Sequence, residues 1–257
     1  MIVELIGSSG AGKTTMAELV QRYARPPHPV VLIGDLISDR PGRRWIRHPK
    51  ALNMLADVTC LPAFLRGRDR SRAFIRYARR RLSRSAPSAF ARYNYLREVV
   101  RDVGKLELAR RVDADAVVLL DEGPLLTAYH LFVYNDAPFA QDDLDRFARL
   151  VPLPDRVVYV TAPVDVLVER AIARSDRRRE LSSGDRREVE RWIARAVEMF
   201  DGLVSSPPIR ERVLVVDNAD DAPLARVSAA SRLADTLGRS FDDPGPAPSR
   251  PSAMRGR

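Results

Sequence analysis

The chain has 257 residues, of which 45% are hydrophobic and 30% are charged, so it can bury a core and global disorder is excluded. Its formal net charge is +9, and the placement of that charge along the chain matters more than its size. The length fits one large α/β domain or two small ones.

Several classes of protein are excluded by residue type. Cys60 is the only cysteine, so an internal disulfide framework cannot form, and one cysteine with three histidines cannot build a structural zinc site. No apolar run approaches the roughly 18 residues that a membrane-spanning helix needs. The first ten residues lack the basic and apolar regions of a secretory signal. We therefore expect a cytoplasmic protein with no membrane partner.

Short apolar runs alternate with helical stretches along the chain. The runs predicted as strands are Ile2–Ile6, Val30–Ile33, Ala116–Leu120, Arg156–Val160 and Val213–Val216. After the first of them, helical spacing extends from Thr14 to about Arg25 and stops at two prolines. Apolar strands separated by helices are typical of parallel sheets that are covered on both faces. The sequence therefore predicts an α/β fold of three layers around a five-stranded parallel sheet.

About 80 residues separate the second and third predicted strands, more than one crossover helix needs. Two amphipathic stripes lie there, with a break at Ser85–Ser88; their members are Phe74, Ile75, Ala78 and Leu82, then Leu96, Val99, Val100, Val103 and Leu106. We predict a helical insertion at about 51–112 within a single domain, 1–240. Residues 241–257 contain four prolines and no periodicity, which predicts a disordered tail.

The insertion is strongly basic. Between Arg66 and Arg111 the chain has 15 lysines and arginines against four aspartates and glutamates. Such a segment forms either a set of solvated helix faces or a surface that attracts anions. Tyr77, Phe90, Tyr93 and Tyr95 lie in the same segment, where aromatic rings serve either the core or base stacking.

The most informative motif follows the first predicted strand. Residues 7–15 read Gly7, Ser8, Ser9, Gly10, Ala11, Gly12, Lys13, Thr14 and Thr15, which matches G-x-x-x-x-G-K-[ST] in full. The glycines let the backbone curl so that its N–H groups face phosphate oxygens, and the following helix adds its positive end. Lys13 then reaches the β- and γ-phosphates and the Thr14 hydroxyl ligates Mg²⁺. We predict a nucleoside triphosphate site.

Two acidic residues follow the third predicted strand, at the sheet edge where ligands bind in open α/β folds. We expect Asp121 to hold Mg²⁺ together with Thr14. Glu122 is predicted as a base, a substrate contact or the partner of an arginine. Asp35 follows the second predicted strand and is a second candidate for the base that orients an acceptor hydroxyl.

A basic run follows the fourth predicted strand. Arg170 and Arg174 are four residues apart and share one helix face, and Arg178 lies among three consecutive arginines beyond them. Guanidinium groups stabilise the charge that spreads over a migrating phosphoryl group. We predict a lid at about 174–184 in which Arg174 and Arg178 assist catalysis.

These motifs together resemble the P-loop kinases, and within them the thymidylate and deoxynucleoside kinases. The resemblance covers residues 1–25 and about 116–237, and leaves out the basic insertion. It implies ATP and Mg²⁺ as cofactors, an arginine lid, and a loop beside the adenine that contains Asn218. Arg170 or Arg174 would be the lid arginine that stacks on the base or clamps phosphate. The chain departs from both families after the third strand, where Asp121 and Glu122 replace their usual Asp-Arg and Glu-Arg-Ser patterns.

The sequence therefore predicts an ATP- and Mg²⁺-dependent kinase that phosphorylates a nucleotide, a nucleoside or another small hydroxylated acceptor. One alternative is a polynucleotide kinase, with nucleic acid as a less favoured partner of the basic insertion. Another is a non-kinase ATPase or a nucleotide-binding regulator, because an Asp-Glu pair also suits hydrolytic ATPases. A homodimer is compatible with the sequence, which does not identify the acceptor.

Overall fold

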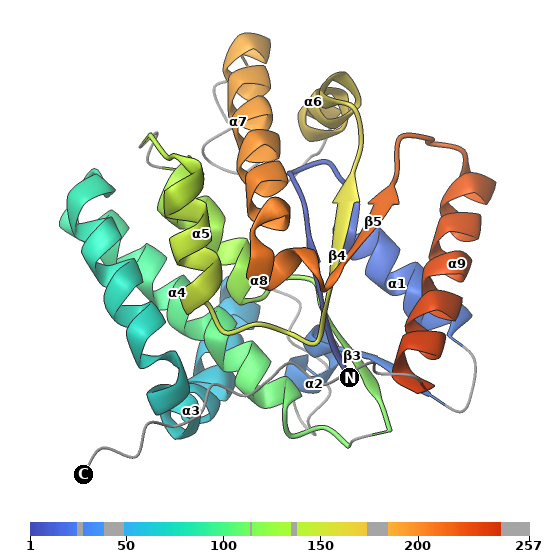
Figure 1. The fold of residues 1–257 in the computed structure, drawn as a ribbon, viewed down its shortest axis with the longest axis horizontal. Helices are drawn as coiled ribbons and strands as arrows, with labels where there is room; N and C mark the ends of the chain where they lie inside the picture. The colour runs from blue at the N-terminus through green and yellow to red at the C-terminus, as the bar shows by residue number, and fades with distance from the viewer. Residues whose placement is uncertain (25–27, 39–48, 114, 135–137, 174–184, 243–257) are drawn as a thin grey trace.

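A five-stranded parallel sheet forms the centre of the computed structural model, which describes residues 1–24, 28–38, 49–113, 115–134, 138–173 and 185–242. The strands are β1 (Ile2–Ile6), β2 (Val30–Leu32), β3 (Val117–Leu120), β4 (Arg156–Thr161) and β5 (Val213–Asp217). Their order across the sheet is β2-β3-β1-β4-β5, and every neighbouring pair is parallel (Figure 1). This arrangement confirms the predicted α/β fold and sheet.

Helices cover both faces of the sheet (Figure 1). They are α1 (Lys13–Tyr23), α2 (Ile33–Ser38), α3 (Pro49–Ser85), α4 (Ala89–Ala109), α5 (Gln141–Leu150), α6 (Val164–Ala173), α7 (Arg186–Ser205), α8 (Pro207–Arg210) and α9 (Pro223–Asp242), with a 3-10 turn η1 (Pro124–Thr127) and a π turn η2 (Tyr129–Val133). Along β4, Val157 and Tyr159 enter one hydrophobic core while Val158 and Val160 enter the other. Both sheet faces are therefore buried, as the predicted strands require.

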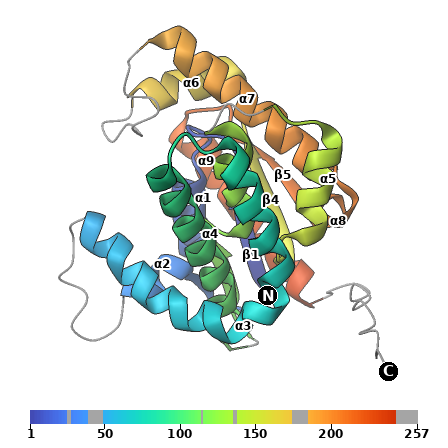
Figure 2. The same cartoon turned by 90° about the vertical axis from the view of Figure 1, so that its left-hand side faces the viewer.

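The insertion is a pair of long helices, α3 and α4, that lie side by side (Figure 2). Phe74 and Leu82 of α3 and Val103 of α4 are fully buried, because both predicted stripes face the core. The predicted break between the helices is confirmed, and the Ser88 hydroxyl caps α4 by accepting a hydrogen bond from the Ala91 N–H at 3.0 Å. At Gly104 an added Cβ would lie 2.5 Å from the Cys60 carbonyl oxygen, so the helices cross at backbone contact.

Two boundaries differ from the prediction. The second strand ends at Leu32 and the chain turns directly into α2, so Asp35 lies in the first turn of a helix rather than after a strand. The predicted tail begins too early, because α9 continues through Phe241 and Asp242. The Phe241 ring lies 3.9 Å from the His28 ring between centroids, and this contact extends the helix. Residues 243–257 lie outside the described residues.

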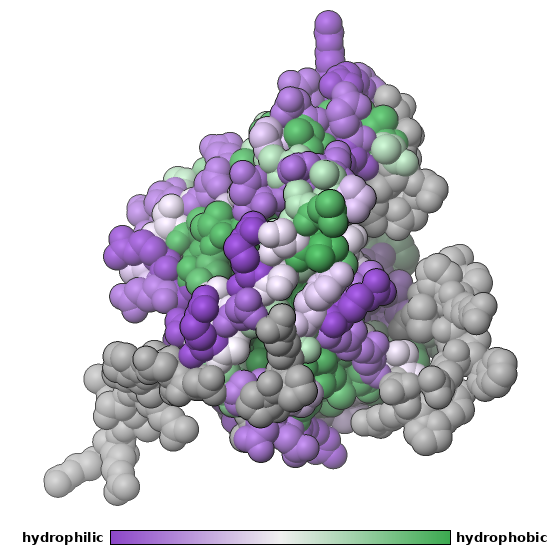
Figure 3. All heavy atoms as spheres, turned by 90° about the vertical axis from the view of Figure 1, so that its right-hand side faces the viewer, coloured by the Kyte–Doolittle hydropathy of each residue, from purple (hydrophilic) through white to green (hydrophobic). Residues whose placement is uncertain are grey.

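The side of the molecule that carries α9 presents small hydrophobic groups interrupted by hydrophilic residues (Figure 3). Isolated apolar side chains of this kind are normal on a protein surface. Among the described residues, no helix is both long enough and apolar enough to cross a membrane.

Candidate functional site

The glycine-rich loop between β1 and α1 has a backbone that its glycines make possible. Gly10 and Gly12 have φ angles of 83° and 82°, in the left-handed region that side chains disfavour. An added Cβ at Gly10 would lie 2.5 Å from the Leu167 carbonyl oxygen, and one at Gly12 would lie 2.7 Å from Asn218 Nδ2. Both the backbone angle and the lack of space therefore require glycine. The loop ends at Gly12, where α1 begins, so the positive end of that helix faces the loop.

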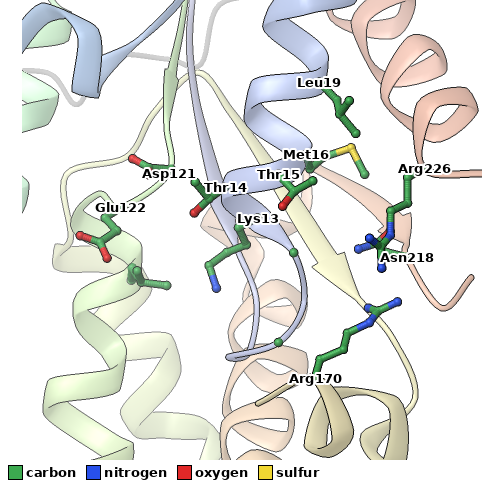
Figure 4. A pocket seen from close by; sticks show the side chains of 13 residues that line it. Lys13, Thr14, Thr15, Met16, Leu19, Asp121, Glu122, Arg170, Asn218 and Arg226 are labelled. Carbon is green, nitrogen blue, oxygen red and sulfur yellow. The ribbon is translucent and has the colours of Figure 1, made fainter. Parts of the chain in front are cut away.

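A cavity of about 390 Å³ opens at this loop (Figure 4). Its lining comes from the loop and α1, from the ends of β3 and β5, and from η1, α6 and α9: Gly10, Gly12, Lys13, Thr14, Thr15, Met16, Leu19, Asp121, Glu122, Leu126, Arg170, Asn218 and Arg226. Residues far apart in the sequence thus converge on one cavity at the carboxyl edge of the sheet, the usual ligand position in this kind of fold.

The Lys13 ammonium lies over the loop. Its Nζ donates hydrogen bonds to the Gly7 carbonyl at 2.8 Å and to the Ser8 carbonyl at 3.1 Å. These two bonds hold the ammonium at the mouth of the loop, where phosphate oxygens would be bound. Opposite it, the Tyr129 hydroxyl accepts a hydrogen bond from the Ser9 N–H at 2.8 Å. The sequence carries no signal for Tyr129, which comes from η2, 120 positions away.

Asn218 and Arg170 form the far wall of the cavity. The buried Asn218 amide donates to the Ala11 carbonyl at 2.8 Å and so joins the end of β5 to the loop. Arg170 Nη2 lies 2.6 Å from Asp221 Oδ1 and 3.3 Å from the Ala219 carbonyl. Hydrogen bonds to the Arg170 guanidinium lower the pKa of Asp221. This wall is therefore held in place by the loop that follows β5.

Thr14 and Asp121, the two residues predicted to hold Mg²⁺, lie next to each other in the cavity (Figure 4). Burial, and then the negative charge of Glu122, raises the pKa of Asp121. A bound cation would offset the negative charge of the Asp121 carboxylate, so this side chain is a suitable ligand for Mg²⁺. No cluster of three or more acidic, histidine or cysteine side chains in the described residues could hold a metal alone. That suits Mg²⁺, which is commonly bound by one or two carboxylates together with nucleotide phosphates.

Glu4 lies beneath the two acidic residues and was missed at the sequence level. It is fully buried in the central strand, and its Oε1 accepts a hydrogen bond from the Leu126 N–H at 3.1 Å. An added Cβ at Gly123 would lie 2.6 Å from the Glu4 carboxyl carbon, so the turn after Glu122 packs directly on this group. The sequence does contain a signal for this buried group, because Glu4 is an acidic residue inside an otherwise apolar predicted strand.

The Glu4 carboxyl predicts a pH-dependent stability. Burial raises its pKa to about 8 from an ordinary 4.5, so the folded protein keeps a proton that the unfolded chain releases. The free energy of unfolding should therefore fall between pH 5 and pH 8, by roughly 3 to 4 kcal/mol from this group. Chemical denaturation across this range should show that Glu4→Gln removes the decline. Glu18→Gln, at an exposed position of α1, is the matched control; equal slopes in both variants and the wild type would contradict the assignment.

A second cavity, of about 310 Å³, adjoins the first and shares Glu122 and Leu126 with it. The remaining lining residues come from α3, α4, η2 and the end of η2: Asn53, Tyr95, Glu98, Arg101, Asp102, Tyr129, His130 and Tyr134. Tyr95, His130 and Tyr134 stack on one another, with ring centroids 5.0 to 5.8 Å apart. Sequence reasoning treated Tyr95 as a core or stacking residue and missed the cavity.

Carboxylates dominate the charge of this second cavity. Arg101 lies 3.8 to 4.0 Å from Asp57, Glu98 and Asp102. Behind them Lys105, with 8% of its side chain exposed, lies 3.0 Å from Asp102 Oδ1 and 3.3 Å from Glu122 Oε2. Burial lowers the pKa of Lys105, but the two carboxylates outweigh it and the net shift is upward. Each of these cations is thus paired with acidic groups of the protein itself.

The other predicted site residues lie elsewhere. Asp35 is exposed on α2, where its carboxylate accepts a hydrogen bond from Gln21 Nε2 at 2.9 Å, and it lines neither cavity. Its role as a base stays a prediction that this position does not favour. Arg174, Arg178 and the rest of the predicted lid lie outside the described residues.

Comparisons with known proteins bear on the fold alone. No family model matches the chain, and no curated protein matches its sequence. Among solved structures, deoxyadenosine kinase from M. mycoides with dCMP and dCDP bound is similar over 93% of this chain and 100% of its own, at 15% identity and a TM-score of 0.50. Shikimate kinase from Bacteroides thetaiotaomicron matches over 93% and 98%, at 17% identity and a TM-score of 0.46. The fold is that of the P-loop kinases, as the motifs predicted.

Proposed function

We propose that the protein transfers the γ-phosphoryl group of ATP to a hydroxyl group of a small, uncharged acceptor. The observation that carries this proposal is the meeting of two cavities at Glu122, one built on the phosphate-binding loop and one walled by aromatic and acidic side chains. A nucleotide in the first and an acceptor in the second would bring their reacting groups together beside this carboxylate. Phosphoryl transfer depends mainly on such positioning and on charge stabilisation.

Eight of the residues that line the first cavity have a role in this proposal. Gly10 and Gly12 shape the loop, Lys13 binds the β- and γ-phosphates, and Asn218 and Arg170 border the nucleoside end. Thr14 and Asp121 would hold Mg²⁺, which, when bound, neutralises phosphate charge. Glu122 has 43% of its side chain exposed and faces both cavities, so it can accept the proton of the acceptor hydroxyl.

The charge of the second cavity supports a hydroxyl acceptor over a phosphate acceptor. Among the described residues, its lining has three carboxylates, Glu98, Asp102 and Glu122, against Arg101 and His130. Arg101 is already surrounded by acidic groups, and Glu98 lies 2.8 Å from His130 Nε2. A nucleoside monophosphate would bring two further negative charges to this place. A neutral nucleoside, sugar or other hydroxylated compound avoids that repulsion.

Matched pairs of acceptors test the proposal. The purified protein, with ATP and Mg²⁺, is offered nucleosides and their 5′-monophosphates, then neutral sugars and their phosphates, and ADP release is measured. We expect turnover with an uncharged member and at least tenfold less with its phosphorylated partner. Turnover with the phosphates alone would overturn the proposed acceptor class. Equal ADP release with and without any acceptor would indicate an ATPase instead.

A substitution of Tyr134, one of the stacked aromatic residues of the second cavity, tests whether the acceptor binds there. Tyr134→Ala should raise the KM for the acceptor about tenfold or more and leave the KM for ATP within twofold, because Tyr134 lines only the acceptor cavity. An unchanged acceptor KM would place the acceptor elsewhere.

A further inference from the structure

A stripe of arginines follows the outer face of α3, away from both cavities described above. Arg68, Arg72, Arg76, Arg80 and Arg84 recur at every fourth residue, and all five are exposed. Four residues of helix rise about 6 Å, so the stripe extends about 24 Å. Like charges four residues apart destabilise a helix, so folding alone does not account for this spacing.

Two hollows lie along the stripe. One, of about 420 Å³, is lined among the described residues by α3 alone, through Phe64, Arg68, Asp69, Arg72 and Ile75. Arg76, Arg80 and Arg84 line the other, of about 680 Å³, which is closed on its far side by α5. Figure 2 shows the face of the molecule on which α3 runs between α4 and α5. Arg76, Arg80 and Arg84 therefore border a track that is concave against α5, and Arg68 and Arg72 continue it along α3.

Two acidic residues of the described chain line this track. Asp69, in the smaller hollow, lies 4.0 Å from Arg68 Nε. Asp143 is the only acidic residue of the larger hollow, and its Oδ1 lies 3.1 Å from Arg81 Nη1. Arg81 also has a structural role, because its Nε donates a hydrogen bond to the Leu131 carbonyl at 2.9 Å. In the part of the chain that the structure describes, no carboxylate pairs with Arg76, Arg80 or Arg84. Arg146 adds a further guanidinium from α5.

Exposed aromatic rings follow the stripe in the chain. The larger hollow ends at Ser85, the last residue of α3, and α4 begins four residues later. In its first two turns Phe90 and Tyr93 are 72% and 64% exposed. A cationic groove with accessible aromatic rings is the combination that binds single-stranded nucleic acids, since the groove follows the backbone and the rings stack on bases.

We propose that the α3–α5 groove binds a single-stranded nucleic acid through its phosphate backbone. A flexible strand can follow the row of exposed arginines along α3 and enter the hollow that faces α5. The groove shares no lining residue with the nucleotide or acceptor cavity. This site is therefore independent of the proposed kinase activity, and each can fail without the other.

Fluorescence anisotropy with a fluorescein-labelled 20-residue oligothymidylate tests the proposal on the full chain. The triple variant Arg76→Gln, Arg80→Gln, Arg84→Gln should bind at least tenfold more weakly at 0.1 M salt, and its log–log salt slope should be shallower by about two. The control is Arg191→Gln, Arg210→Gln, Arg239→Gln, which removes the same charge from exposed positions on other helices and should bind within twofold of wild type.

Two further measurements complete the test. Phe90→Ala with Tyr93→Ala should weaken binding about fivefold or more without changing the salt slope, because stacking is lost and phosphate contacts remain. Excess MgATP should not displace the oligonucleotide. Equal binding by the arginine triple variant and its control, or displacement by MgATP, would overturn the proposal. Capture of the protein by phosphatidylserine–phosphatidylcholine vesicles without oligonucleotide binding would assign the groove to a membrane surface and overturn it as well.

Discussion

Replacing Lys13 by alanine should reduce phosphoryl transfer at least a thousandfold while the protein stays folded. The ammonium is the one side-chain cation that the loop places at the phosphates, and removing a group that stabilises developing charge costs a hundred- to thousandfold in kcat even for an uncharged donor. Its Nζ donates hydrogen bonds to two carbonyls of the same loop, at 2.8 and 3.1 Å, and the side chain is not part of the buried core. Steady-state ADP release measures the loss of phosphoryl transfer, and thermal unfolding of each variant shows whether the fold is retained.

Arg22→Ala is the matched control for Lys13→Ala. Arg22 is an exposed cation in the last turn of the same helix, remote from the loop, and its loss should change turnover less than twofold. Undiminished phosphoryl transfer by Lys13→Ala would refute the triphosphate site. Loss of activity together with a collapsed melting temperature would show that the lysine serves the fold.

Glu122→Gln should lower kcat between a hundred- and ten-thousandfold with little change in the KM for ATP. This carboxylate is shared by the two cavities, and a positioned base contributes about that factor to proton transfer. Glutamine keeps the shape and the hydrogen-bonding oxygen but cannot take the acceptor proton. In this variant the Lys105 ammonium can still pair with Asp102, which lies 3.0 Å from it, so the positive charge of the lysine is not left unpaired.

Asp35→Asn decides between the two candidate bases. Its carboxylate lies on α2, bonded to Gln21 and outside both cavities, so the variant should turn over within about twofold of wild type. If Asp35→Asn is inactive and Glu122→Gln is active, the acceptor lies at the β2 edge and the assignment of the second cavity is wrong.

The phosphate-binding loop was predictable because its chemistry is local. Glycine at positions 10 and 12 permits left-handed backbone, and the motif with its flanking strand and helix lies within 25 residues. The acidic pair after β3 was predictable for a related reason, since the ends of parallel strands meet at one edge of the sheet. Asp35 shows the limit of this rule: a one-residue shift in the strand end puts the side chain into α2.

The second cavity, which we propose for the acceptor, could not be predicted. Tyr93 and Tyr95 are two residues apart on one helix, yet Tyr93 is exposed while Tyr95 stacks on His130 and Tyr134. Helical spacing distinguishes the two faces of α4 but does not say which segment covers either face. That choice depends on where η2 packs, and η2 is too short and irregular to have a periodic signature.

By itself the amino-acid sequence determined the sheet, the glycine-rich loop between β1 and α1 and the basic character of the insertion, because each depends on residue types at short, fixed offsets. Only the tertiary structure decided that Tyr129 and Asn218 hold the loop from 120 and 207 positions away, and that Glu122 separates two cavities. It also arranged the α3 arginines along a groove against α5. Such contacts arise from the packing of distant segments, and packing selects partners by shape and burial that no local pattern encodes.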